Sequence, residues 1–172
     1  MSFFARLFGT QADPREQWRP LWHAVVEQAR DPDWYRMCGV ADSVEGRFDM
    51  ITLILSLALI RMESDEGLAA HSALLTELFV EDMEGQLREA GIGDPTVGKK
   101  IGKIMSSMGG RLGTYRAALA DEDRVALAAA VRRNVTMAQE DEAEALGERM
   151  IRLHKRMMRT SELQLRAGEI AQ

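Results

Sequence analysis

The chain has 172 residues, 46% of them hydrophobic and 28% charged, which excludes a globally disordered chain and favours one domain with a sizeable core. Leu, Ala, Glu, Arg and Met are frequent and aromatic residues make up only 6%, which indicates an all-α fold. The net charge of −5 conceals separate acidic and basic stretches, and the single cysteine, Cys38, excludes an intramolecular disulfide.

Residues 1–12 are expected to form a short N-terminal arm ahead of a helical domain at residues 13–172. The arm lacks the long apolar stretch and small-residue cleavage site of a secretory signal. We therefore expect a cytoplasmic protein, either free or peripheral on the cytoplasmic face of the inner membrane. Phe3 and Phe4 beside Arg6 are typical of a weak membrane-interface segment, and a flexible or packed terminus is an equally good interpretation.

Capping residues and prolines predict where the helices begin. The expected starts are Asp13-Pro14, Asp31-Pro32, Asp42 or Ser43, Asp94-Pro95 and Asp121. The expected helices cover residues 14–30, 32–39, 43–60, 66–90, 94–120 and 121–134, followed by about two dozen residues from 140. Gly91 fits the C-terminal cap of the fourth helix, and Gly109-Gly110 is expected to kink or end the fifth.

The spacing of apolar residues predicts the buried faces of these helices. The apolar stretch at 50–60 has about half the length of a bilayer-spanning helix, so we expect a core helix that is buried on several faces. One side of the helix at 66–90 carries Leu68, Leu75, Leu78, Phe79, Met83 and Leu87. The final, basic helix carries Leu146, Met150, Leu153 and Met157.

An acidic helix and a basic helix are joined by a glycine-rich break within residues 78–115. Residues 91–113 contain seven of the 14 glycines and three of the four lysines. Small residues recur at every fourth position, as Gly98, Gly102, Ser106 and Gly110. Such a face allows close approach either of a partner or of another helix of the same chain, and both interpretations stay open.

Sequence templates for enzymes and metal sites do not fit this chain. Residues 93–100, GDPTVGKK, approach the phosphate-binding loop, but Lys100 replaces the magnesium-binding hydroxyl and the preceding residues are predicted to be helical. None of the three histidines follows a glutamate by three residues, as a ferritin-like metal site requires. We therefore expect no catalytic residue, no metal and no cofactor.

Two further patterns lie in the basic helices. Met105 and Met108 are most simply core residues, although a methionine-rich surface also adapts to varied apolar partners. Four arginines recur beside the apolar stripe of the final helix: Arg149, Arg152, Arg156 and Arg159. They form either a solvated face or a surface for anionic lipid or RNA phosphate.

The sequence L-R-E-A-G-I-G-D at residues 87–94 carries a resemblance to a known family. With F-V-E-D-M at 79–83, Lys99-Lys100, Gly110-Arg111 and Tyr115, it resembles the ubiquinol-cytochrome c chaperone family over about residues 18–133. The chain departs from the family at Met108-Gly109, where an aromatic pair would be expected.

The resemblance implies a non-enzymatic assembly chaperone that binds newly synthesised cytochrome b and assists assembly of ubiquinol-cytochrome c reductase. Mitochondrial relatives work at the ribosomal tunnel exit with a small partner protein, and for this chain both features are options. We expect no DNA partner. The expected client-binding groove has a floor of Met105, Met108 and neighbouring apolar residues. Its edge is formed by Arg88, Glu89, Asp94, Lys99, Lys100 and Lys103. Gly91, Gly93 and Arg111 complete the predicted partner-binding residues.

Two alternatives accompany that hypothesis. Helix capping and local ion pairing explain Glu89 and Asp94 equally well. The alternative function is a peripheral membrane or ribosome-associated adaptor that binds an anionic membrane surface or the ribosome through Phe3, Phe4, Arg149, Arg152, Arg156 and Arg159.

Overall fold

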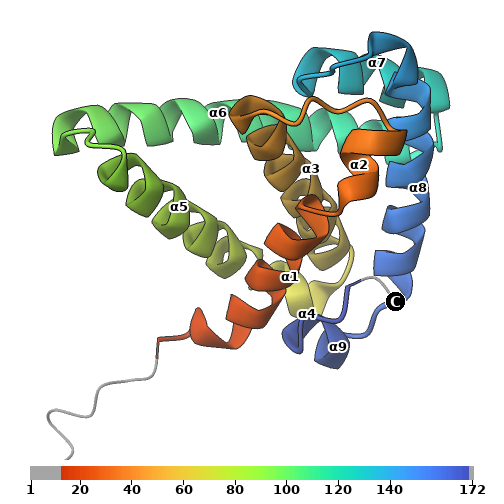
Figure 1. Cartoon of the computed structure of the whole chain (residues 1–172). Helices are drawn as coiled ribbons and strands as arrows, with labels where there is room; N and C mark the ends of the chain where they lie inside the picture. Colours follow the sequence, from red (N-terminus) through yellow and green to blue (C-terminus); the bar gives the residue numbers. More distant parts are fainter. Residues whose placement is uncertain (1–12, 171–172) are drawn as a thin grey trace, which may run out of the picture.

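The computed structural model describes residues 13–170, apart from the side chain of Glu140. In chain order the elements are η2 (Glu16–Trp18), α1 (Arg19–Ala29), α2 (Pro32–Met37), α3 (Val44–Glu63), α4 (Glu66–Ala69), α5 (Ser72–Glu89), α6 (Asp94–Ala120), α7 (Arg124–Asn134), η3 (Glu140–Glu142), α8 (Ala143–Arg159) and α9 (Glu162–Arg166) (Figure 1). Within the described residues the sole β-feature is an isolated bridge between Val40 and Met137. The prediction of an all-α fold is therefore confirmed.

Helix α3 lies at the centre of the fold. It packs against α1, α5, α6 and α8, which surround it in Figure 1. Met50, Leu53, Ile54 and Leu57 are fully buried, as expected for a helix that is apolar on several faces. No helix in the described range has the combined length and hydropathy that crossing a membrane requires.

Two of the predicted caps lie where the sequence placed them. The Asp31 side chain accepts a hydrogen bond from the Asp33 amide at 2.9 Å, and the Ser43 hydroxyl accepts one from the Gly46 amide at 3.1 Å. At Gly46 the chain passes so close to itself that an added Cβ would lie 2.0 Å from the Ala41 carbonyl oxygen. Glycine is therefore required in this first turn of α3.

The start predicted at Asp121 is wrong by two residues. Asp121 follows the last residue of α6, and Asp123 is the residue whose side chain caps α7 by accepting from the Ala126 amide at 2.9 Å. Between them Glu122 adopts a positive φ of 49°, which separates the two helices.

Two long helices of the sequence prediction are divided in the structure. The helix expected over residues 66–90 is interrupted at Ala70 and His71, where the His71 ring lies 5.4 Å from that of Trp18. The final helix ends at Arg159, because Arg61 of α3 donates to the Met157 and Thr160 carbonyl oxygens and Ser161 then caps a separate α9. At both interruptions the chain contacts a residue distant in the sequence, Trp18 or Arg61.

The connection between α5 and α6 follows the prediction. Gly91 has a φ of +80°, a conformation that favours glycine, and it follows the last turn of α5. Gly93 is the N-cap residue of α6, and Pro95 lies in the first turn of that helix. Helix α6 then continues through Gly109 and Gly110, so this pair does not end it.

His154 on α8 is expected to make the fold sensitive to acid. Burial lowers its pKa below the usual value of 6.5, and its Nδ1 atom is buried without a hydrogen-bond partner among the described residues. Because the folded state disfavours the protonated ring, its stabilising contribution is complete above the unfolded-state pKa and is lost as the pH falls through the folded-state pKa. Replacing His154 by glutamine should therefore reduce the loss of stability between neutral and mildly acidic pH. Urea unfolding at the two pH values measures this, and an unchanged pH dependence would contradict it.

Candidate functional site

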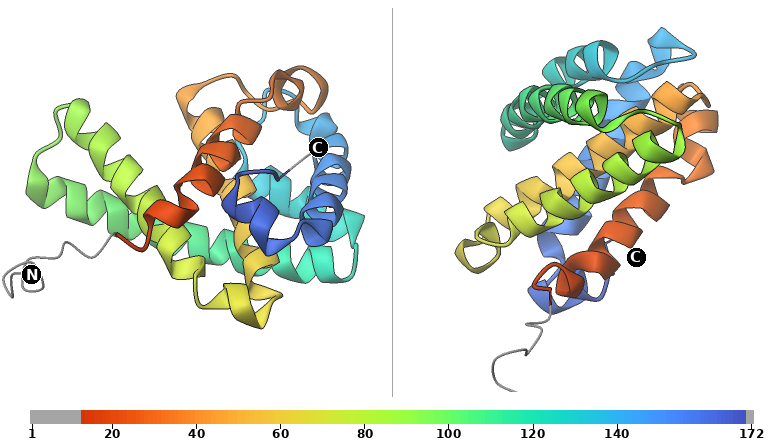
Figure 2. Two further views of the ribbon diagram at one scale, coloured as in Figure 1. Left: turned by 90° about the horizontal axis from the view of Figure 1, so that it is seen from below. Right: turned by 90° about the vertical axis from the view of Figure 1, so that its left-hand side faces the viewer.

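A groove opens where α5 and α6 diverge. The two helices are joined by residues 90–93 and separate from there, as Figure 1 and the right-hand view of Figure 2 show. The hollow between them and α3, which we call the α5–α6 groove, has a volume of about 850 Å³. Its apolar lining comes from all three helices: Leu59, Ala73, Val80, Met105, Met108 and Leu112. Of these, Val80, Met105 and Leu112 are partly exposed, in a concave surface large enough to receive part of another molecule.

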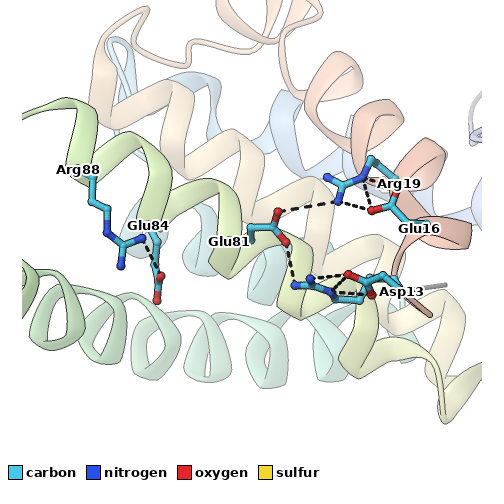
Figure 3. Close-up of polar contacts among 7 residues, drawn as sticks. Asp13, Glu16, Arg19, Glu81, Glu84 and Arg88 are labelled. Carbon is cyan, nitrogen blue, oxygen red and sulfur yellow. Dashed lines mark hydrogen bonds and ion pairs between the residues drawn. The ribbon is translucent and has the colours of Figure 1, made fainter. Parts of the chain in front are cut away.

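The rim of the α5–α6 groove is acidic. Its charged lining residues are Glu63, Glu77, Glu81, Glu84 and Arg15. Figure 3 shows the part of this rim on α5, where Glu81 faces the helix start at residues 13–19 and Glu84 lies beside Arg88. The four carboxylates outnumber the single basic lining residue, so the groove favours a cationic over an anionic ligand.

The single basic lining residue is already held by carboxylates. Arg15 donates to Asp13 at 2.6 Å and to Glu81 at 2.8 Å, and Arg19 lies 3.8 Å from Glu81. Hydrogen bonds from Arg15 lower the pKa of Asp13 to about 2, so this carboxylate stays charged under ordinary conditions. Arg15 is therefore engaged within the protein and does not present a free positive charge in the groove.

The structure brings Met105 and Met108 together in the floor of the groove. Met105 is partly exposed, whereas Met108 is 4% exposed and also belongs to the core. Met108 is thus mainly a core residue, whereas Met105 contributes to the groove surface. Their expected contact with a client stays a prediction.

The expected basic edge is not part of this groove. Lys99, Lys100 and Lys103 are exposed on α6, but the rim is formed by glutamates. Successive residues of a helix advance by about 100°, which places Lys99 and Lys103 on the side of α6 that faces away from Met105. The predicted groove therefore combined lysines and methionines that lie on different sides of α6.

The remaining charged residues of the expected edge form local contacts. Arg88 lies 3.2 Å from both Glu84 and Asp94, so it links the end of α5 to the start of α6. Glu89 is exposed. Asp94 is the first residue of α6 and its cap position is held by Gly93, which supports the alternative of local ion pairing for Asp94.

Arg111 lies inside the protein. Its guanidinium group is 2.7 Å from an Asp49 carboxylate oxygen and donates to the Thr52 hydroxyl at 2.8 Å. The other oxygen of Asp49 accepts from the amide and the hydroxyl of Thr136 at 2.9 and 2.8 Å. This network fastens α6 to α3, which gives Arg111 a structural role that the sequence hypothesis did not anticipate.

The resemblance to a phosphate-binding loop has no structural counterpart. Residues 94–100 are helical, and the Val97 amide already donates to the Gly93 carbonyl oxygen at 3.1 Å. A phosphate cradle requires such amides to converge on the ligand, and they are committed to α6. Among the described residues, moreover, no group of three or more His, Cys, Asp or Glu side chains is placed to hold a metal ion.

The glycine face of α6 points into open space. A Cβ built on Gly98, Gly102 or Gly110 would have no atom of another element within 4 Å, and Ser106 between them is exposed. The interpretation as a tight crossing with another helix of the same chain is therefore wrong. Access of a partner to this face stays a prediction.

These open positions predict a stabilising substitution. Replacing both Gly102 and Gly110 by alanine should raise the free energy of unfolding by about 1–2 kcal/mol, because alanine favours the helix by about 1 kcal/mol per site and meets no neighbour. Urea unfolding measures the change. Replacing Gly46 by alanine is the matched control and should destabilise, since its Cβ would collide with Ala41. A destabilised double variant would contradict the exposed placement of this face.

The four arginines of α8 do not form one surface. Arg149 lies 4.2 Å from the Trp34 ring centroid and 2.6 Å from Asp31, so it fastens α8 to α2. Arg152, Arg156 and Arg159 are exposed. Only these three remain available for an anionic surface, while Phe3 and Phe4 lie outside the described residues.

Sequence reasoning missed the acidic residues of the groove. The sequence places Glu77 and Glu84 only in an acidic stretch, and Glu81 also in the F-V-E-D-M motif, because the usual position of such residues is a solvated helix face. Val80 was the available signal, since it is an apolar residue that lies outside the predicted stripe of α5. An apolar residue outside the buried stripe of an amphipathic helix indicates that the helix contacts something on a second side, here the groove.

A helical fold with an apolar groove at its surface is typical of proteins that bind apolar segments of other proteins. Comparison with known families agrees with this class. The model of the ubiquinol-cytochrome C chaperone family matches residues 36–171, and the chain belongs to this family. The match extends further towards the C-terminus than the expected 18–133 and includes α8 and α9.

The fold also matches a solved structure. The crystal structure of the Cbp3 homolog from Brucella abortus superposes with a TM-score of 0.79 and shares 32% sequence identity. The alignment covers 98% of this chain and 95% of that one. No curated protein matches the sequence. The chain is thus a member of a chaperone family whose helical fold it shares over nearly its whole length.

Proposed function

We propose that this protein is a non-enzymatic assembly chaperone that binds newly synthesised cytochrome b and assists the assembly of ubiquinol-cytochrome c reductase. The observation that carries the proposal is the α5–α6 groove, a concave apolar surface in a member of a chaperone family. A client rich in membrane-spanning helices exposes apolar surface until it is inserted and assembled. Reversible coverage of that surface requires no catalytic residue.

The site of binding is proposed in two parts. Val80 and Met105 are partly buried residues in the groove and are proposed to contact the client directly, beside the more deeply buried Met108. Methionine suits this role because its flexible thioether side chain adjusts to different apolar shapes. The corner formed by Gly91, Gly93 and the Arg88–Asp94 pair is proposed to hold α5 and α6 at the angle that keeps the groove open.

Copurification during cytochrome b synthesis tests this function. Tagged full-length protein is captured from cells pulse-labelled during synthesis of cytochrome b, and an unrelated multi-helix membrane protein labelled in parallel is the specificity control. We expect preferential recovery of cytochrome b, reduced in a variant with Val80→Asp and Met105→Asp. Equal recovery of the two membrane proteins would contradict the proposed client.

The exposed end of the arginine row supports the second candidate function, a peripheral membrane or ribosome-associated adaptor. Within the described residues, Arg156 and Arg159 are exposed and form no ion pair with an acidic side chain. Substituting Arg152, Arg156 and Arg159 together by glutamate is the appropriate test, because Met150, Leu153 and Met157 of the same helix are core residues and deleting α8 would unfold the protein. Loss of sedimentation with anionic liposomes or ribosomes would favour this function, and unchanged sedimentation would oppose it.

A further inference from the structure

The acidic residues on the α5 side of the groove are arranged as a row. Glu77, Glu81 and Glu84 follow one another at spacings of four and three, so they lie on one face of α5. Val80 lines the groove on the same helix, and Met105 and Leu112 line it from α6. An apolar floor therefore runs alongside a line of carboxylates.

These carboxylates are available to a partner. Among the described residues, Glu77 forms no ion pair. The Glu81 side chain is 48% exposed but already pairs with Arg15 at 2.8 Å, so it offers less free charge than Glu77. Glu84 contacts Arg88, whose side chain is 53% exposed. Across the groove, Glu63 contacts Arg116, which is 49% exposed. Ion pairs as exposed as those of Arg88 and Arg116 contribute little to stability, so a cation on a partner can replace either arginine at little cost.

The conformation of the bound segment follows from the backbone around the groove. The described residues contain no sheet edge, and the backbone groups of α5 and α6 are already bonded within their helices. A helical segment suits this surface because it satisfies its own backbone hydrogen bonds. One helical turn occupies about 400–600 Å³, from a diameter of about 10–12 Å and a pitch of about 5.4 Å. The groove, at about 850 Å³, is comparable in size with one to two such turns.

We propose that the α5–α6 groove binds one apolar helical segment that carries lysine or arginine at its flank. The apolar face of the segment contacts Val80, Met105 and Leu112, and its basic flank contacts Glu77, Glu81 and Glu84. Membrane-spanning helices commonly carry lysine and arginine at their cytoplasmic end, which gives this chemistry a source in a newly made membrane protein. The inference rests on the proposed chaperone function and adds which part of the client is recognised.

Binding of designed peptides to the full-length protein tests the inference. One fluorescent peptide carries an apolar helical segment followed by two lysines, and a second carries two glutamates at the same positions. We expect the lysine peptide to bind about tenfold more tightly at low salt, and the preference to fall as salt is added. Equal affinity for the two peptides would overturn the inference.

Reversing the charges of the groove glutamates tests whether the preference for the lysine peptide arises in the groove. E77K, E81K and E84K together should abolish or invert it, whereas K99E, K100E and K103E together, the matched change on the outer face of α6, should leave it intact. An equal effect of the two triple variants would overturn the placement in the groove. Should the first variant fail to fold, E77Q with E84Q removes two charges and should reduce the preference, and an unchanged preference would again contradict the inference.

The same variants separate this inference from the proposed function. If the wild-type protein captures cytochrome b and the variant with E77K, E81K and E84K captures it equally well, the recognition of a basic flank is wrong and the chaperone function stands. If the wild-type protein captures no cytochrome b but prefers the lysine peptide, the proposed client is wrong and the chemistry of the groove stands.

Discussion

Replacing Arg111 by methionine is expected to lower the free energy of unfolding by about 3–5 kcal/mol. The substitution preserves the apolar part of the side chain but leaves Asp49, which is 7% exposed, as a buried charge without its cation. The amide and hydroxyl of Thr136 would remain its hydrogen-bond donors. Urea unfolding followed by circular dichroism measures the loss.

A surface pair that also joins α6 to α3 provides the control. Arg116 lies 2.5 Å from Glu63, but its side chain is 49% exposed, so replacing Arg116 by methionine should cost less than about 1 kcal/mol. Adding Asp49→Asn to the Arg111 variant should recover part of the loss, because the asparagine oxygen still accepts from Thr136 and carries no charge. Equal losses for the Arg111 and Arg116 variants would contradict the buried pair.

Replacing Arg149 by alanine is expected to cost about 2–4 kcal/mol, the second largest effect. The substitution removes a cation–π contact with Trp34 and ion pairs with Asp31 and Asp33 at 2.6 and 3.6 Å. With 19% of its side chain exposed, Arg149 is shielded from solvent, which strengthens these interactions. Thermal and urea unfolding both report the change.

Arg152→Ala is the matched change one turn further along α8. Arg152 is 62% exposed and lies 3.8 Å from Glu148, so its loss should lower the free energy of unfolding by less than about 1 kcal/mol. A similar small loss for Arg149 would mean that it does not fasten α8 to α2. If replacing Arg149 costs about 2–4 kcal/mol as expected, a test of membrane or ribosome binding must keep Arg149, since its loss would destabilise the fold.

The local sequence predicts much of the helical framework. Asp31 and Ser43 cap α2 and α3 as expected, because capping depends on the residue itself and its next neighbours. Spacing alone identified the buried stripe of α8, whose Leu146, Met150, Leu153 and Met157 are fully buried. The interruption at His71 and the end of α8 were not predictable, because each involves a residue far away in the chain, Trp18 or Arg61.

The candidate site was less predictable than the fold. Residue type identified Met105 and Met108, since flexible apolar side chains stand out in a basic helix. The acidic row was not predictable, because Glu77 and Glu81 line a groove only where α5 diverges from α6. The direction of that divergence is set by tertiary contacts such as the Arg111–Asp49 pair, which local spacing does not reveal.

Site-specific crosslinking during cytochrome b synthesis tests the central claim most directly. A photoreactive residue is placed at Val80 or Met105 in the groove, or at Lys103, which is exposed on the side of α6 that faces away from Met105. The account predicts cytochrome b crosslinks from Val80 and Met105 and few from Lys103. Crosslinks from Lys103 alone, or none from either groove position in a folded protein, would contradict binding of cytochrome b in the α5–α6 groove.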